Sequence, residues 1–94
     1  MTTFFMFGNY TPDAVKKISI TRTEKAIDII EKLGGEVKGL YALLGEYDLL
    51  FCVNLPDVEA ATKASISLAQ LTGITFRTCP AIKVEVFDRL VTGK

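Results

Sequence analysis

The sequence predicts a mixed α+β domain with the element order β-α-β-β-α-β, on three observations. Four short runs rich in β-branched and aromatic residues alternate with two longer segments of helical periodicity. Glycines end both helical segments, at Gly34 and Gly73. A third glycine, Gly45, lies in a short turn between the second and third strand-like runs. Ninety-four residues allow one domain, so residues 1–94 are expected to fold as a single unit.

The N-terminal third is expected to contain one strand followed by an interrupted helix. Thr3–Asn9 is rich in aromatic residues, which favours a strand. Thr11 can cap a short first helical piece. Thr21 and Glu24 have the spacing of a capping box, which is expected to restart the helix or mark a bend in it. Helical periodicity then continues to Leu33.

Three more strands are expected. Val37–Leu44 and Tyr47–Asn54 are joined by Gly45-Glu46, which fits a two-residue hairpin loop. Ile74–Thr78 is the fourth strand, interrupted at Pro80.

The second helix is expected to begin at Pro56-Asp57. The residues of this helix that face inward are expected to be Val58, Ala61, Ser65, Leu68 and Leu71. After the fourth strand a strand-like or helical tail, Ile82–Val91, is expected.

This element order is the split βαβ arrangement of the ferredoxin-like fold. The expected sheet is a four-stranded antiparallel sheet in the order 4-1-3-2, and its first and third strands are expected to run parallel at the centre. Cys52 and Cys79 then lie on either side of the first strand. Strands about 4.8 Å apart would separate their Cα atoms by roughly 10 Å, beyond disulfide reach. Both are interpreted as small buried apolar residues.

One face of this sheet lacks a cover within the chain, because both helices pack on the other face. Phe4–Phe7 and Leu49–Val53 are nevertheless apolar at every position. Either parity therefore leaves at least four apolar side chains on the bare face, whose burial is worth roughly 6–12 kcal/mol. We expect a second copy of the chain to cover them. The alternative is that the C-terminal tail folds back over the sheet.

Composition limits the classes of partner and of chemistry that are expected. Eleven basic and eleven acidic side chains balance, so neither nucleic acid nor an anionic membrane is an expected partner. No apolar stretch approaches the roughly 18–20 residues of a membrane span, and the N-terminus lacks the pattern of a signal peptide, so a soluble cytoplasmic protein is expected. The chain has no histidine and two lone cysteines, so no metal site, cofactor or nucleophile–base pair is expected and no catalytic residue is identified.

Five segments of the chain carry a resemblance to a known family: Ile20–Arg22, Leu33–Val37, Gly45–Leu49, Asn54–Asp57 and Thr75–Thr78. Over about Thr3–Ala81 the sequence resembles the GYD domain family. The family's glycine, tyrosine and aspartate are matched by Gly45, Tyr47 and Asp48. This resemblance implies a dimeric α/β-barrel protein. The C-terminal half is also similar to the ligand-sensing module of leucine-responsive regulators, which implies binding of an amino acid or other small metabolite at subunit contacts.

The candidate ligand-binding residues are polar side chains at strand ends and beside the expected turn. They are Asn9, Arg22, Tyr41, Tyr47, Asp48 and Arg77. Tyr47 and Asp48 could donate to and accept from a polar ligand, or Asp48 could accept backbone N–H groups in the turn. Asn9 could bind a ligand or assist the turn that follows it. Arg22, which matches an arginine of the family, and Arg77 could each hold a carboxylate or lie exposed to solvent.

The leading hypothesis is a homo-oligomeric protein that binds a small polar or anionic metabolite in the barrel or at a subunit contact. Two alternatives stay open. One is a cofactor-independent oxygenase or isomerase of the dimeric α/β-barrel type, acting on a hydrophobic substrate, which rests on fold analogy. The other is a structural assembly subunit without a ligand.

Overall fold

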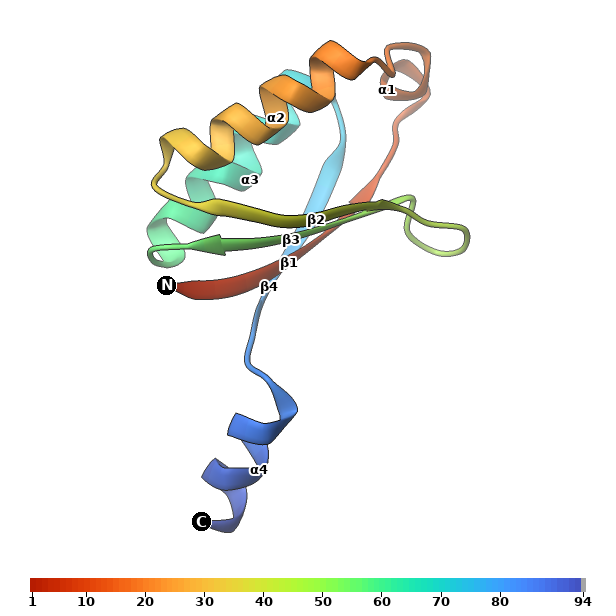
Figure 1. The fold of residues 1–94 in the computed structure, drawn as a ribbon. Coiled ribbons are helices and arrows are strands. Elements are labelled where there is room, and N and C mark those ends of the chain that lie inside the picture. The colour runs from red at the N-terminus through yellow and green to blue at the C-terminus, as the bar shows by residue number, and fades with distance from the viewer. Residues whose placement is uncertain (94) are drawn as a thin grey trace.

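The computed structural model describes residues 1–93 and has the predicted α+β, ferredoxin-like order (Figure 1). The expected short helical piece near the start is present, and the tail, expected to be strand-like or helical, is a helix. The strands are β1 (Thr2–Asn9), β2 (Glu36–Ala42), β3 (Leu49–Leu55) and β4 (Thr75–Ala81). The helices are α1 (Pro12–Lys16), α2 (Ile20–Lys32), α3 (Val58–Thr72) and α4 (Val84–Thr92). Helices α2 and α3 cover one face of the sheet.

The sheet order β2-β3-β1-β4 is the predicted one, but the predicted direction of the central pair was wrong. β1 and β3 run antiparallel, as do all neighbouring pairs. Helix α2 returns the chain to the starting end, so β1 and β2 point the same way, and the turn after β2 then reverses β3. The parallel pair of the split βαβ unit is therefore β1 and β2, with β3 inserted between them.

Helix α2 begins two residues before the start that the capping pattern of the sequence predicted. Ser19, in extended conformation, is its N-cap, and the Ser19 hydroxyl accepts a hydrogen bond of 3.0 Å from the Arg22 backbone N–H. The expected box of Thr21 and Glu24 was wrong, because both residues already lie within the first turns of the helix. The predicted interruption is confirmed: α1 and α2 are separate helices.

The core lies between the helices and one face of the sheet. Alternate residues of the two central strands face α2 and α3 and are buried, Met6 and Val53 completely. The buried cluster comprises Phe4, Met6, Ala26, Ile30, Phe51, Val53, Leu55, Ala61, Ala64 and Leu68. Val58 was wrongly placed on the inward stripe of α3, since its side chain is 62% exposed.

A longer connection than predicted joins β2 to β3. β2 ends at Ala42 and β3 begins at Leu49, so residues 43–48 form a loop in place of the expected two-residue turn. The Leu43 backbone N–H donates to the Asp48 carbonyl at 2.8 Å, which closes the loop at its base. Gly45 has a φ of +136° at its tip, a conformation that favours glycine.

Both edge strands carry an irregularity. The register between β2 and β3 shifts between Val37 and Gly39, so Lys38 is an extra residue in a bulge. β4 continues through Pro80, which pairs with Phe4, although the sequence predicted an interruption there. Proline is tolerated at this position because β4 is an edge strand.

Helix α4 leaves the end of β4 and projects away from the domain, on the side of the sheet opposite to α2 and α3 (Figure 1). The alternative, in which the tail folds back over the bare face, is thus not seen in this chain. The molecule is elongated, with principal extents of 50 × 30 × 18 Å. Among the described residues, no helix combines the length and the apolarity that crossing a bilayer requires.

We expect the core and the exposed loop to respond very differently to the same truncation. Leu68→Ala should lower the free energy of unfolding by about 2–5 kcal/mol, because Leu68 is fully buried. Leu44→Ala, at a fully exposed leucine of the 43–48 loop, should change it by less than about 0.5 kcal/mol. Urea denaturation at one fixed protein concentration measures both. Equal midpoints for the two variants would contradict this account of the core.

Candidate functional site

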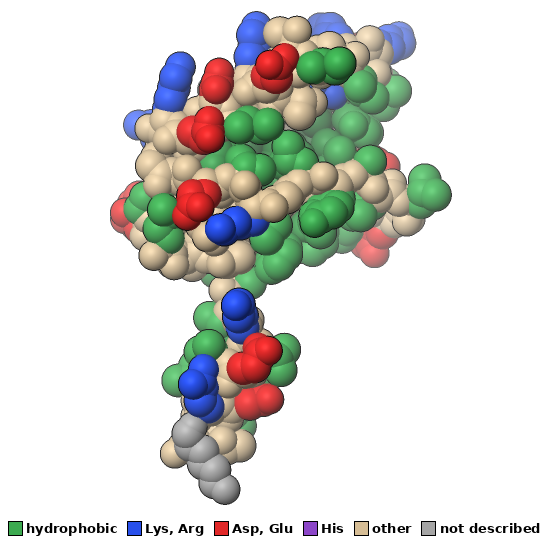
Figure 2. All heavy atoms as spheres, in the orientation of Figure 1, with side chains coloured by type: hydrophobic (Ala, Val, Ile, Leu, Met, Phe, Trp, Pro, Cys, Tyr) green, Lys and Arg blue, Asp and Glu red, His purple; other side chains and the backbone are tan. Residues whose placement is uncertain are grey.

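A small cavity opens between α2 and the edge of the sheet. Its volume is about 140 Å³. Figure 2 shows hydrophobic side chains in the hollow between α2 and β2. The apolar lining comprises Ile18, Ala26, Leu40, Ala42, Leu49, Phe51 and Ile74. The other lining residues are Tyr10, Arg22, Thr23, Tyr41 and Thr72. A cavity of this composition suits a small molecule with an apolar body and a polar end.

Arg22 is the cation of this cavity. One of its guanidinium nitrogens, Nη1, donates a hydrogen bond of 2.7 Å to the Ala14 carbonyl. The guanidinium carbon lies 5.9 Å from the centre of the Tyr10 ring. Arg22 is half-buried, and the one ion pair among residues 1–93 joins Lys38 and Glu36. Arg22 therefore has no carboxylate partner in the described part of the chain, and it keeps donors free for an anion.

Asp48 connects the loop before β3 to the end of β1 through hydrogen bonds. Its carboxylate accepts a hydrogen bond of 2.9 Å from the Tyr10 backbone N–H. Its own backbone N–H donates to the Gly8 carbonyl, also at 2.9 Å. Asn9 acts in the same place, since its side-chain amide donates to the Glu46 carbonyl at 2.9 Å. These contacts give Asp48 and Asn9 a structural role next to Tyr10, which lines the cavity.

The remaining candidate residues are not gathered around Arg22. The Tyr47 ring packs on Phe7, with 4.9 Å between ring centres. The sheet register aligns Tyr41, Leu50, Phe7 and Arg77 in one row across the four strands. Tyr41 and Arg77 therefore lie at opposite edges of the sheet. Within one chain these two side chains are three strand spacings apart, too far to hold one carboxylate together.

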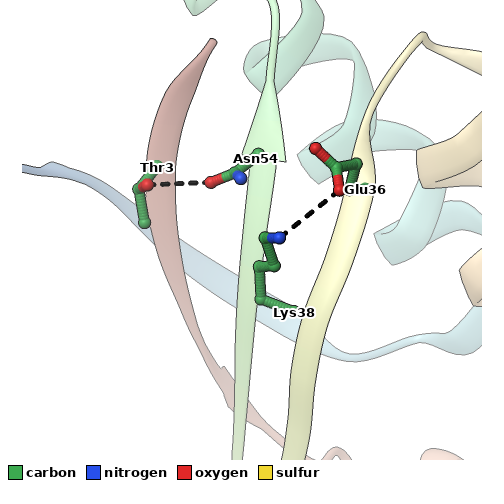
Figure 3. Close-up of polar contacts among 4 residues, drawn as sticks. All are labelled: Thr3, Glu36, Lys38 and Asn54. Atoms are coloured by element: carbon green, nitrogen blue, oxygen red, sulfur yellow. Dashed lines mark hydrogen bonds and ion pairs between the residues drawn. The ribbon is translucent and has the colours of Figure 1, made fainter.

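The face of the sheet opposite α2 and α3 is here called the open face. Its centre is apolar, because Phe5, Phe7, Leu50 and Cys52 point to this side, and all four are only half-buried. Its end near the N-terminus is polar (Figure 3). There the Thr3 hydroxyl donates to the Asn54 side-chain oxygen at 2.8 Å. The Lys38 Nζ atom lies 3.4 Å from the Glu36 Oε2 atom.

The two thiols lie on the open face. Phe5 pairs with Cys52 on one side and with Cys79 on the other, so the strand between them keeps them apart, as predicted. Both are free. The expectation that they are buried was wrong, because Cys52 is half-buried and Cys79 is exposed on the edge strand.

Among residues 1–93, no three His, Cys, Asp or Glu side chains come together in a way that could hold a metal ion. The cavity residues of the described chain also include no carboxylate or thiol. The side chains that the lining offers are an arginine, the Tyr10 ring and two threonines around an apolar floor, which is a set suited to binding. Tyr41 lies at the margin of the cavity, and its side chain is over Gly39 on the open face.

Sequence reasoning selected Arg22 and Tyr41 from the cavity and missed most of its lining. Tyr10 follows Asn9 at the end of β1, and this position could have indicated it. The apolar lining residues carried no such signal, because Ile18, Leu40 and Ile74 are far apart in sequence and look like ordinary core residues.

Comparison with known proteins identifies the family of this chain. The sequence profile of the GYD domain family matches residues 4–91. The chain belongs to the GYD domain family. None of the curated proteins matches the sequence at a significant level.

Solved structures that resemble this chain include bacterial regulators. They include the leucine response regulatory protein LrpA of Mycobacterium tuberculosis, at 13% identity and a TM-score of 0.58 over 87% of this chain and 51% of that one. An AsnC family transcriptional regulator from Agrobacterium tumefaciens matches at 19% identity and a TM-score of 0.58, over 87% of this chain and 50% of that one.

A third similar structure contains a ligand. It is a feast or famine regulatory protein from M. tuberculosis complexed with L-methionine, at 13% identity and a TM-score of 0.58, over 88% of this chain and 51% of that one. The chain spans about half the length of the structures that it matches. At these identities the likeness establishes the fold.

We expect Asp48 to matter through its hydrogen bond to Tyr10. Asp48→Ala should lower the free energy of unfolding by about 1–3 kcal/mol, because the part-buried Tyr10 N–H would lose its acceptor. Asp48→Asn should lose much less, since the amide oxygen can accept the same bond. Chemical denaturation measures both, with exposed Glu46→Gln as the control. Equal losses in the Ala and Asn variants would instead assign the effect to the negative charge.

Proposed function

We propose that this protein is a homodimer that binds a small metabolite carrying an anionic group, in the cavity beside Arg22. The observation that carries the proposal is a half-buried arginine, without a carboxylate partner in residues 1–93, at the mouth of a largely apolar cavity. A carboxylate can accept two parallel hydrogen bonds from a guanidinium group. The ligand's anionic end would meet Arg22, and its apolar body would contact Leu40, Phe51 and neighbouring side chains.

The size of the cavity limits the ligand. At about 140 Å³ it is well below the roughly 300–1,000 Å³ of sites for drug-sized molecules. A molecule as small as an amino acid or a short carboxylic acid matches this volume. The methionine complex of the feast or famine regulatory protein supports the same ligand class by analogy of fold.

The homodimer is supported by the open face. Phe5, Phe7, Leu50 and Cys52 expose part of their apolar surface at its centre. Covering four such side chains would contribute roughly 6–12 kcal/mol if they were fully exposed beforehand, and correspondingly less for half-buried ones. A second copy presents an identical apolar surface of the same size, which suits a two-fold dimer.

The enzyme alternative, a cofactor-independent oxygenase or isomerase, has weaker support. Proton abstraction needs a base within hydrogen-bond reach of the substrate. Within the described residues, the cavity lining offers only the hydroxyls of Tyr10, Thr23 and Thr72 beside the Arg22 cation, because the Tyr41 side chain lies over Gly39 on the open face. The lining is therefore better equipped for binding than for acid–base chemistry.

The open face can be tested by placing a charge at its centre. Phe5→Glu should raise the dissociation constant of the dimer by at least about 100-fold, because the carboxylate would be desolvated between two apolar sheets. The matched control is Val58→Glu, which adds the same charge at an exposed valine on α3. Sedimentation equilibrium measures both, with circular dichroism to verify folding. A wild-type chain that stays monomeric at micromolar concentration would overturn the dimer.

The cavity can be tested with a defined set of ligands. L-methionine, L-leucine and isovalerate are compared with uncharged isovaleramide by calorimetric titration. A carboxylate of this set should bind, and Arg22→Gln should weaken that binding by about 10- to 150-fold, the equivalent of one charged hydrogen bond. Arg89→Gln, at an exposed arginine of α4, should leave it unchanged. Equal binding of isovalerate and isovaleramide would contradict a role for the arginine charge.

A further inference from the structure

Helix α4 is amphipathic and has no cover in the described chain. On a helix of 3.6 residues per turn, its apolar residues occupy one half of the surface and its polar residues the other. The apolar half comprises Val84, Val86, Phe87, Leu90 and Val91, which are 37% to 71% exposed. The polar half comprises Glu85, Asp88, Arg89 and Thr92. Figure 2 shows α4 standing clear of the domain.

Such a helix needs a packing partner to be stable. It has 9 residues, whereas isolated helices shorter than about 12–15 residues are only marginally stable in water. Its N-cap, Lys83, makes no side-chain capping hydrogen bond. Intrinsic propensity and capping therefore do little to hold α4, and packing of the apolar half must contribute most of its stability.

The position of α4 indicates where that partner lies. Only Ile82 and Lys83 separate α4 from β4, and the helix projects on the side of the open face (Figure 1). The corner between sheet and helix forms a hollow of about 620 Å³. Its walls include Phe5 and Cys52 of the open face and Val84 of α4. Anything seated on the open face must therefore also lie beside α4.

We propose that α4 is an arm that packs its apolar half against the second copy of the chain docked on the open face. By two-fold symmetry each copy would extend its arm along the other, and each hollow would be filled by the partner. This inference rests on the self-association proposed above. It adds an exchanged helix to a contact that would otherwise involve the two sheets alone.

Surface area supports a second copy as the occupant. Each apolar side chain of α4 has on the order of 60–120 Å² to bury, so one arm offers roughly 300–600 Å². A stable interface of standard size buries about 800 Å² on each partner. The open face and the arm together reach this size more readily than the open face alone.

Charge argues against a membrane as the occupant. Helices that lie on anionic membranes are rich in lysine and arginine on the polar face. Between Lys83 and Thr92 the chain carries two basic residues, Lys83 and Arg89, and two acidic residues, Glu85 and Asp88, so the segment has no net charge.

The test compares one substitution on each half of α4 in the full chain. Phe87→Glu should raise the dimer dissociation constant by at least about tenfold, because the carboxylate would enter the contact with the partner. Thr92→Glu adds a similar charge on the polar half and should change it by less than about twofold. Sedimentation equilibrium measures both constants. In parallel, reaction of Cys79 with a soluble thiol reagent should be slow in wild type and in Thr92→Glu, and faster in Phe87→Glu, where dissociation uncovers the open face.

A cross-link identifies the contact directly. A photoreactive benzoylphenylalanine in place of Phe87 is introduced into protein labelled with ¹⁴N and, separately, with ¹⁵N, and the two are mixed to equilibrium. Cross-linked peptides that combine both isotopes are expected, because the arm would contact the other copy. Cross-links of a single isotope only would place α4 on its own chain and overturn the exchange, while leaving the dimer intact.

Self-association and the exchange of the arm can be contradicted separately. A wild-type monomer with reactive thiols would overturn self-association and, with it, the arm. A wild-type monomer with protected thiols would mean that α4 folds over its own sheet, which also overturns both. If the wild type is a dimer and Phe87→Glu changes its dissociation constant no more than Thr92→Glu does, the arm alone is overturned.

Discussion

Both long helices pack on one face of a sheet whose central strands are apolar on both faces, and the rest of the structure depends on this mismatch. Along β1, Met6 points into the covered core, whereas its neighbours Phe5 and Phe7 point to the open face. Successive residues of a strand must face opposite sides, so the chain cannot bury one set without presenting the other. The domain completes its core within one chain and leaves a second apolar surface outside it.

Much of the architecture could be predicted from local patterns. Glycine at Gly73 does end α3 in the left-handed conformation, and the apolar runs do form the two central strands. Other features depended on contacts between distant segments. Ser19 rather than Thr21 caps α2, and both residue types suit an N-cap. The loop after β2 is long because Tyr47 and Asp48 leave the strand to contact Phe7 and Tyr10 at the end of β1.

The candidate site could likewise be predicted only in part. Arg22 could be selected from the sequence because it matches an arginine of the family, and the structure places it at a cavity. Asp48 was weighed as a ligand contact or a turn residue, and its hydrogen bond to Tyr10 fits the second role. The floor of the cavity could not be predicted, because Leu40, Phe51 and Ile74 come from three different segments and only the fold brings them together. Cys79 was misjudged because its residue type was taken to indicate burial, although the predicted order already placed its strand at an edge of the sheet.

The irregularities of the two outer strands bear on how the chain can assemble. Proline at Pro80 removes one backbone donor from β4, and the extra residue at Lys38 distorts β2 and adds a charge. Such features discourage another strand from extending the hydrogen-bonded ladder sideways. Growth into a continuous ribbon is thereby disfavoured at both margins. In the proposed dimer the open face of each copy would be covered by the other, which would leave no apolar sheet surface to recruit a third copy. The proposed assembly would therefore be closed, and it would not grow into a fibre.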